Sequence, residues 1–114
     1  MKVLLVEDEA LVRMMAAETL EDAGFEVIEA ATGEEAVEAC RIHRADVLFT
    51  DIRLPGKLSG WDVAEHCRAH HPDLPVIYAT GYSEAAPRRV PGSAFFRKPY
   101  RPAEVVKTIL TLTR

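Results

Sequence analysis

The sequence predicts an α/β domain built on a doubly wound, five-stranded parallel sheet with helices on both faces. Short apolar runs of the buried-strand type alternate along the chain with longer segments whose apolar residues recur at helical spacing. No internal repeat, low-complexity segment or linker interrupts this alternation. Such a regular alternation favours parallel strands joined by right-handed helical crossovers.

The composition is that of one globular domain. The chain has 114 residues, of which 48% are hydrophobic and 28% are charged, and folding at this size buries roughly 65% of the surface that the unfolded chain exposes. The apolar runs are too short to cross a bilayer, and the N-terminus lacks the length and cleavage region of a signal peptide. The net charge of −4, from 14 basic and 18 acidic side chains, argues against general nucleic-acid binding. We expect residues 1–114 to form one cytoplasmic domain without membrane or nucleic-acid contacts.

The first strand and the first helix are predicted at residues 2–6 and 10–23. Three successive acidic residues, 7–9, interrupt the first apolar run, and Gly24 ends the helix. The helix is predicted from the helical spacing of its apolar residues. Its inward face is expected to carry Val12, Met15, Ala16, Thr19, Leu20 and Ala23.

The second strand and helix follow within residues 26–44. Residues 26–30 alternate with period two, which is typical of a strand near the edge of a sheet. Thr32 followed by Glu35 is a capping-box pattern, so a helix is expected from there to about Arg44. Its inward residues are expected to be Ala36, Val37 and Cys40.

The middle of the chain holds the strand at residues 47–50, which ends on the carboxylate of Asp51. A loop is expected over residues 52–59, and Gly60 leads into a third helix. This helix should end near Pro72, because proline and the residue before it both resist helical continuation.

The last third of the chain contains two more strands, at residues 75–79 and 94–96, but only one regular helix. Pro102 opens that helix, whose apolar face is expected to carry Val105, Val106, Ile109 and Leu110. The interval 81–93 contains two prolines and two glycines. We therefore predict that the fourth helix of the regular alternation is short or irregular, and that this segment is mobile.

The residues with chemical character cluster where the predicted strands end. In a parallel sheet the carboxyl ends of all strands lie on one edge, where open α/β sheets bind their ligands. The strand ends deliver Glu7, Asp8, Asp51, Thr80 and Lys98. With the common strand order 2-1-3-4-5, the first and third strands are neighbours, so three carboxylates are expected in one pocket.

Three carboxylates in one pocket repel each other unless one binds a proton or a hard cation neutralises them. Mg²⁺ suits such a site because it accepts carboxylate and carbonyl oxygens and keeps waters for an incoming phosphoryl group. Asp51 can then act as a nucleophile toward phosphorus, with Lys98 and Thr80 holding phosphoryl oxygens. Taken singly, the same residues remain open to simpler interpretations, with Asp51 and Thr80 as caps and Lys98 as a solvated surface charge.

Together these residues resemble the pattern of bacterial response-regulator receiver domains, and the likeness covers essentially the whole chain. It rests on Glu7-Asp8, Asp51 followed by Pro55, Thr80 and Lys98-Pro99. The resemblance implies a flavodoxin-like fold and a phosphorylation switch rather than a turnover enzyme. It also implies self-catalysed phosphorylation and dephosphorylation of Asp51, with a histidine kinase or a histidine phosphotransfer protein as the donor. Such a domain is either free-standing or the receiver of a hybrid kinase.

The resemblance further implies a metal-ligand set. Asp8 and Asp51 would ligate Mg²⁺ directly, together with the backbone carbonyl of Arg53, and Glu7 would act through water. The alternative of a Mg²⁺-dependent phosphatase is disfavoured, because such enzymes usually carry a second acid two residues after the nucleophile, and here that residue is Arg53. A small flavodoxin is disfavoured because residues 7–9 are acidic where a phosphate loop would be needed.

Receiver domains also transmit their phosphorylation state, and the resemblance assigns this to Thr80 and Phe95 as a switch pair, with Lys98 on the phosphoryl group. We expect a monomer or weak dimer that acts on a downstream protein partner. A phosphorylation-independent interaction module remains an alternative, although the acid, Thr and Lys set is intact.

The sequence departs from the usual receiver pattern in three places. The loop from Pro55 to Gly60 is one residue longer than usual, which puts the contacts near the metal in question. Phe95 stands where Tyr is frequent. Residues 75–82 are similar to the Pro-Phe-x-Phe-Ala-Thr-Gly-Tyr signature of an alphaproteobacterial receiver subgroup, which has a loop in place of a regular fourth helix.

Cysteine and histidine carry no strong signal of a metal site. Cys40 and Cys67 lack CxxC spacing and fall within helical patterns, so buried free thiols are expected. His66 and His70 stand four residues apart but lack a further paired ligand, so they are expected to be solvated.

Overall fold

The computed structural model describes residues 1–81 and 88–114, which form five strands and four helices. The strands are β1 (Lys2–Val6), β2 (Glu26–Ala30), β3 (Val47–Asp51), β4 (Val76–Thr80) and β5 (Ala94–Arg97). The helices are α1 (Ala10–Asp22), α2 (Gly33–Ile42), α3 (Gly60–His70) and α4 (Pro102–Leu112). Within the described part of the chain, no helix is both long and apolar enough to cross a membrane.

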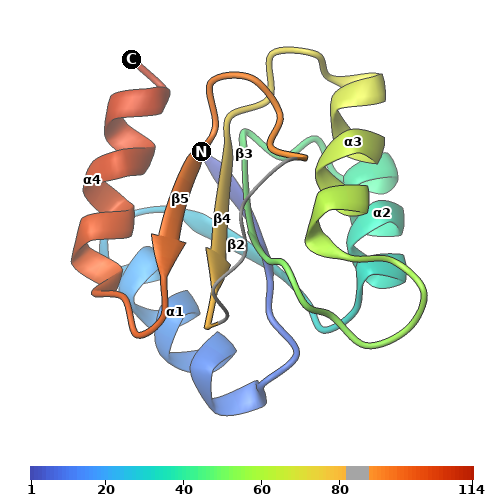
Figure 1. Ribbon diagram of the computed structural model, residues 1–114. Helices are drawn as coiled ribbons and strands as arrows, with labels where there is room; N and C mark the ends of the chain where they lie inside the picture. The colour runs from blue at the N-terminus through green and yellow to red at the C-terminus, as the bar shows by residue number, and fades with distance from the viewer. Residues whose placement is uncertain (82–87) are drawn as a thin grey trace.

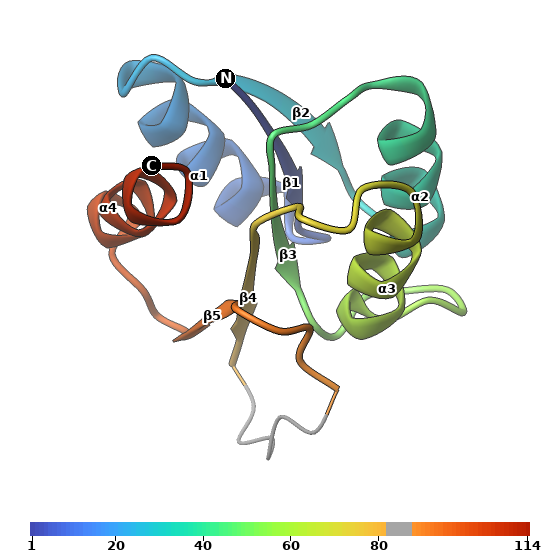
Figure 2. The ribbon, with the colours of Figure 1, turned by 90° about the horizontal axis from the view of Figure 1, so that it is seen from above.

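The five strands form one parallel sheet in the order β2-β1-β3-β4-β5, which confirms the predicted fold and strand order. Figures 1 and 2 show α1 and α4 on one face of the sheet and α2 and α3 on the other. Every residue of the two central strands β3 and β4 is buried. Their near-continuous apolar sequences follow from this burial on both faces.

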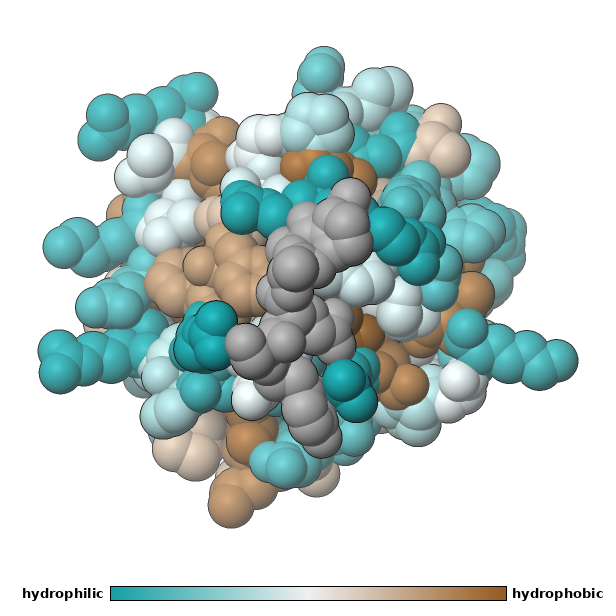
Figure 3. Space-filling view, viewed as in Figure 1, coloured by the Kyte–Doolittle hydropathy of each residue, from teal (hydrophilic) through white to brown (hydrophobic). Residues whose placement is uncertain are grey.

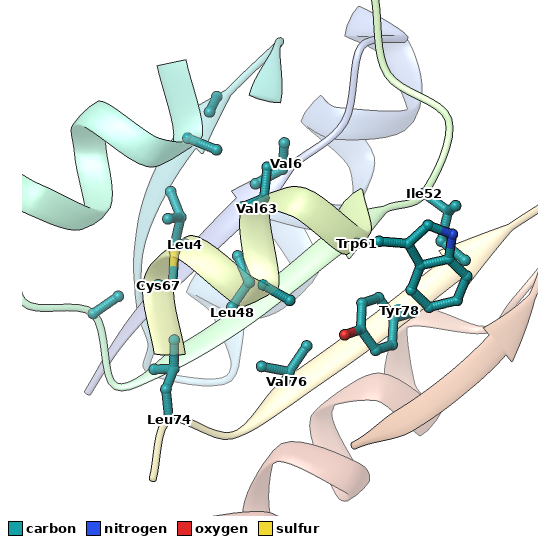
Figure 4. Close-up of a cluster of buried hydrophobic side chains, with 14 residues drawn as sticks. Leu4, Val6, Leu48, Ile52, Trp61, Val63, Cys67, Leu74, Val76 and Tyr78 are labelled. Carbon is teal, nitrogen blue, oxygen red and sulfur yellow. The ribbon is translucent and has the colours of Figure 1, made fainter. Parts of the chain in front are cut away.

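Alternate side chains of the strands pack into two separate cores, because successive side chains point to opposite faces of the sheet. Leu4, Leu48 and Tyr78 belong to the core beneath α2 and α3, which Figure 4 shows. Leu5 and Phe49 belong to the core beneath α1 and α4. The sheet is therefore held from both sides, and its carboxyl edge is positioned by packing along the whole length of each central strand.

Two of the predicted helical faces are partly wrong. Met15 of α1 is 57% exposed and Leu110 of α4 is 54% exposed, although the periodicity placed both inward. Ala23, also predicted to face inward, is exposed directly after the end of α1. The buried face of α1 is centred instead on Ala16, Ala17 and Leu20. Residues at the flank of an amphipathic face share its spacing but not its burial, because only the centre of the face meets the sheet.

Two of the four helices, α2 and α3, begin at side-chain caps. The Thr32 hydroxyl accepts a hydrogen bond from the Glu35 amide at 3.0 Å, as predicted, but the Glu35 carboxylate accepts from the Ala31 amide and not from that of Thr32. A complete capping box occurs at α3, where Ser59 and Asp62 bond each other's backbone amides. This second cap was not predicted, although Ser59-x-x-Asp62 has the required spacing.

The segment between β4 and β5 lies against α3 where the structure describes it. The prediction of a short or irregular fourth helix falls mostly on residues 82–87, which are outside the described residues. The described residues of this interval, 81 and 88–93, contain no helix. The Arg88 guanidinium donates to Asp62 Oδ1 and Glu65 Oε1, both at 2.7 Å. The Val90 amide donates to the Tyr78 hydroxyl at 3.2 Å. These bonds attach residues 88–90 to α3 and β4.

The Arg88 contact predicts a pH-dependent contribution to stability. Hydrogen bonds from Arg88 and then from Ser59 lower the pKa of Asp62 from about 3.8 to about 2. A lowered pKa in the folded state stabilises the protein above the unfolded value and loses this contribution as the pH falls through about 2. Because Arg88 is exposed and solvent screens the pair, we expect Arg88→Gln to lower the free energy of unfolding only modestly at pH 7, and by much less near pH 2. Urea denaturation at the two pH values measures this difference.

The matched control is Arg44→Gln, which removes the same charge from an exposed position at the other end of the sheet. It should leave the free energy of unfolding nearly unchanged at both pH values. An Arg88→Gln loss of equal size at pH 7 and near pH 2 would contradict the assignment of the effect to the Asp62 carboxylate.

Candidate functional site at the carboxyl edge of the sheet

The structure gathers the predicted site residues around one hollow at the carboxyl edge of the sheet. Glu7 and Asp8 follow β1, Asp51 ends β3, Thr80 ends β4, and Lys98 follows β5. The hollow has a volume of about 630 Å³ and is lined by Glu7, Asp8, Glu9, Asp51, Arg53, Leu54, Pro55, Gly81 and Lys98. The parallel sheet thus brings residues more than 90 positions apart, Glu7 and Lys98, into direct contact.

The three carboxylates form a compact group. One oxygen each from Glu7, Asp8 and Asp51 lies within 4.8 Å of the others. Glu7 and Asp51 are buried and Asp8 is exposed, so the group opens to solvent through Asp8. Among residues 1–81 and 88–114, this is the one group of three or more acidic, His or Cys side chains with such spacing. Its oxygen donors are those that a hard divalent cation prefers.

Lys98 holds the two buried carboxylates together. Its ammonium donates to Glu7 Oε1 at 2.5 Å and to Asp51 Oδ2 at 3.0 Å. Burial alone would lower the pKa of Lys98, but its bonds to Glu7 and Asp51 raise this pKa above its usual value. Burial raises the pKa of both Glu7 and Asp51, and the Lys98 bonds oppose this rise. The lysine is therefore a charged counter-ion to both carboxylates.

Asp51 is positioned by its own backbone and by a close glycine. Its Oδ1 accepts the Ile52 amide at 2.8 Å, and the Ile52 amide nitrogen also lies 3.1 Å from the Ala79 carbonyl of β4. Gly60, at the start of α3, approaches so closely that a Cβ there would lie 2.1 Å from the Asp51 carbonyl oxygen. The cap of α3 is Ser59, so the interpretation of Asp51 as a cap for the helix that follows it is wrong. Its carboxylate faces the hollow instead.

The remaining predicted residues lie around this centre in different ways. Thr80 is fully buried, and its carbonyl accepts the Lys98 amide at 2.8 Å, which ties the ends of β4 and β5 together. Arg53 is exposed and lines the hollow. Phe95 does not line the hollow; it is partly buried against the core that contains Trp61 and Tyr78.

Tyr100 is a neighbour of the site that the sequence analysis missed. Its ring meets the Phe49 ring edge-on, with centroids 5.4 Å apart. Burial, followed by the charge of Glu7, raises the pKa of Tyr100 to about 12. The sequence did contain a clue to this position, because Tyr100 is an aromatic residue two positions after Lys98. The turn that follows β5 brings its ring back toward Phe49 of β3. Tyr100 and Lys98 both line a second, apolar hollow of about 400 Å³, whose other wall is formed by residues of α1.

The arrangement supports one kind of chemistry best. Buried carboxylates with a neighbouring fixed cation are suited to hold a divalent metal and to stabilise the charge of a transferring phosphoryl group. A basic residue, Arg53, occupies the position where an aspartate-based phosphatase would carry its second acid. The site therefore contains a candidate nucleophile and charge-stabilising groups, but the general acid expected of such a phosphatase is not present at that position.

Comparison with known proteins identifies relatives of this chain. The family model of the response regulator receiver domain matches residues 3–110. The transcriptional regulatory protein PdtaR of Mycobacterium tuberculosis is 33% identical over 113 residues, which cover 95% of this chain and 54% of PdtaR. The sensor kinase CckA of Brucella abortus is 35% identical over 113 residues, covering 94% of this chain and 12% of the kinase. The chain thus spans about half or less of these relatives.

A solved structure shows the same fold over nearly the whole chain. The crystal structure of a response regulator receiver protein from Sinorhizobium medicae WSM419 matches with a TM-score of 0.94 and 32% identity, covering 98% of this chain and 93% of that one.

Proposed function

Because this chain belongs to the response regulator receiver domain family, whose members are signalling switches of two-component systems, we propose that its Asp51 accepts a phosphoryl group from a phosphohistidine donor. The observation that carries the proposal is the position of Asp51, 8% exposed, in the acidic hollow with its Oδ2 bonded to Lys98. Its carboxylate attacks phosphorus, the bond from phosphorus to the donor nitrogen breaks, and an acyl phosphate forms.

Mg²⁺ is the proposed cofactor, and the donor set fits it because all side-chain ligands are carboxylate oxygens. Asp8, Asp51 and the Arg53 carbonyl would hold it directly, and Glu7 would act through water. Bound there, the ion supplies neutralisation of phosphoryl oxygens. Lys98 stabilises another oxygen of the same group through its ammonium.

Phosphorylation is proposed to reach the surface through Thr80 and Phe95. Residues 76, 78 and 80 of β4 share one face of the sheet, and Phe95 of β5 is the register partner of Tyr78. A shift of Thr80 toward the phosphoryl group therefore acts on the side of the sheet that carries α3 and residues 88–90. We propose that residues 1–114 form one domain, which is a monomer or weak dimer. The domain itself catalyses hydrolysis of its acyl phosphate, and a downstream protein partner binds according to its phosphorylation state.

The direct test is incubation of the protein with acetyl phosphate and Mg²⁺, followed by intact mass measurement. The expected result is a gain of one HPO₃ group that disappears with time after the donor is removed. Retention of the original mass over a range of donor concentrations would overturn the proposed function.

The metal site predicts a large effect of Asp8 on Mg²⁺ binding. Asp8 is exposed, so Asp8→Asn should fold normally while losing a direct ligand. Changes in the outer shell of metal sites typically cost 10–100-fold in affinity, and loss of a ligand should weaken Mg²⁺ binding by at least about tenfold. Isothermal titration with MgCl₂ measures this loss. Glu9→Gln is the matched control, because it removes the same charge from the same hollow and should change the affinity far less; equal losses in both variants would contradict Asp8 as a ligand.

The phosphodonor protein is proposed to dock on the first turns of α1. Leu11, Met14 and Met15 are 64%, 57% and 57% exposed and stand at i, i+3 and i+4, so they share one helical face. The first turn of α1 follows directly after the acidic residues 7–9, and the apolar hollow beside Met15 shares Lys98 with the acidic hollow. In Figure 3 hydrophobic surface appears at the lower edge, where α1 lies in Figure 1. A donor seated there can place its phosphohistidine close to Asp51.

This surface predicts a separation between protein and small-molecule donors. Met15→Glu should reduce the rate of phosphotransfer from a phosphohistidine protein by at least about tenfold, because it charges the centre of the apolar contact. Labelling by acetyl phosphate should stay unchanged. Ile42→Glu, at a 61% exposed position of α2, is the control and should affect neither rate. Equal loss with both donors would place the defect in the acidic site and not in docking.

A further inference from the structure

Two thiols from different helices meet on the face of the sheet that carries α2 and α3. Figures 1 and 2 show these helices side by side, with Cys40 in the second half of α2 and Cys67 in the second half of α3. Cys67 is 1% exposed, and Figure 4 shows its side chain among those of the core. Cys40 packs against the same core while remaining partly exposed. The two thiols lie close enough that each shifts the pKa of the other. The fold therefore brings together two cysteines that are 27 positions apart in the sequence.

The surroundings of Cys40 favour its reaction with a small oxidant. A hollow of about 210 Å³ opens beside it and is lined by Cys40, Arg41, Ile42, Arg44, Ala45, His70 and His71. Arg41 and Arg44 bring positive charge to this hollow, and positive neighbours favour the thiolate, which is the reactive form of cysteine. In the described ranges 1–81 and 88–114, no group of three His, Cys or acidic ligands forms here, so the thiols are not part of a metal cluster.

We propose that Cys40 and Cys67 form an intramolecular disulfide when the protein meets hydrogen peroxide. The Cys40 thiolate attacks one peroxide oxygen, the O–O bond breaks, and sulfenic acid forms at Cys40 with release of hydroxide. The Cys67 sulfur then attacks the Cys40 sulfur, the S–O bond breaks, the Cys67 proton is lost, and water leaves. The two sulfurs lose two electrons in total, and one peroxide molecule is reduced. The Cys67 proton leaves in the water of the second step, and the hydroxide of the first step takes up the proton that Cys40 lost when its thiolate formed, which gives a second water.

The thiols are suited to these unequal roles. The neighbouring Cys67 thiol lowers the pKa of Cys40, while the Cys40 thiol and burial raise the pKa of Cys67. Cys40 therefore supplies the thiolate next to the open hollow, and the enclosed Cys67 acts as the resolving thiol. Enclosure of the partner beside it favours disulfide formation over further oxidation of Cys40.

The cross-link joins α2 to α3 away from the acidic hollow. Both cysteines lie toward the C-terminal ends of their helices, which are at the opposite edge of the sheet from the strand ends. The proposal does not rest on phosphorylation of Asp51. A closed loop between residues 40 and 67 restricts the unfolded chain, so oxidation is expected to raise the melting temperature by about 5–10 °C.

The test treats the reduced full chain with hydrogen peroxide, quenches with an alkylating agent, and maps peptides without reductant. The expected result is a peptide linking Cys40 to Cys67, two hydrogens lighter than the sum of its parts, together with the rise in melting temperature, both reversed by dithiothreitol. Oxidation of the exposed methionines adds oxygen without affecting this linked peptide. Cys40→Ser and Cys67→Ala should each abolish the link and the temperature rise, with Cys40→Ser leaving the fold intact because its site is partly open.

Three outcomes would overturn the proposal. Recovery of both cysteines as alkylated thiols would show that peroxide does not reach the pair. Sulfinic acid at Cys40 without a linked peptide would show that Cys67 does not resolve the sulfenic acid. Dimers linked through Cys40 would show that the partner thiol comes from a second chain.

Discussion

Asp51→Asn is expected to reduce phosphorylation by acetyl phosphate to background. The amide cannot attack phosphorus as a carboxylate does, and it removes one of the two buried charges that Lys98 neutralises. The change is nearly isosteric, so the bond from the Ile52 amide to the side-chain oxygen can be retained. Intact mass measurement after incubation with acetyl phosphate and Mg²⁺ gives the labelled fraction of each variant.

The matched control is Asp73→Asn, at an exposed position in the loop between α3 and β4 at the opposite edge of the sheet. This variant should be labelled as fast and as fully as the wild type. Labelling of Asp51→Asn at the wild-type rate, with the phosphoryl group mapped to another residue, would contradict Asp51 as the acceptor.

Gly60→Ala is expected to lower the free energy of unfolding by about 3 kcal/mol or more, which is at the upper end of overpacking effects. An added Cβ would lie 2.1 Å from the Asp51 carbonyl oxygen and 2.8 Å from the Ile52 Cα, and both are backbone atoms that cannot rotate away. Relief requires α3 to move away from the end of β3, so the position of Asp51 should change as well. Urea denaturation measures the first effect and acetyl phosphate labelling the second.

Gly81→Ala provides the control for this prediction. Among the described residues, its added Cβ would meet the Lys98 Cβ at 3.9 Å, which is ordinary contact distance, and nothing nearer. This variant should stay within about 1 kcal/mol of the wild type. A Gly60→Ala protein as stable as Gly81→Ala would show that the start of α3 can shift freely from β3.

The sheet and the centre of the site could be predicted from the sequence for a simple reason. Buried strands such as β3 and β4 have apolar runs that only a doubly covered sheet explains, and the residue after each run must lie at the same edge. Glu7, Asp51 and Lys98 were placed by this rule alone, and the structure brings them within hydrogen-bonding distance.

The features that were missed depend on how elements pack and not on local pattern. Met15 has the spacing of the inward face of α1, but it lies at the flank that borders the Tyr100 hollow. Tyr100 approaches Phe49 only because the chain turns after β5 and brings α4 back across the sheet. Periodicity describes one helix at a time, so it cannot show where two elements leave a gap between them.

The Lys98 ammonium has a consequence for the proposed Mg²⁺ site. In the absence of a cation from solution, Glu7 and Asp51 already share a positive charge that belongs to the chain. A divalent ion entering the hollow must compete with this internal ion for the same oxygens. The measured affinity for the ion would therefore reflect the difference between the free energy with which the carboxylates bind the ion and that with which they bind the Lys98 ammonium. A lysine released from its carboxylates would become available to an incoming anion. Binding of a metal ion would in this way free Lys98 to bind the oxygens of a phosphoryl group.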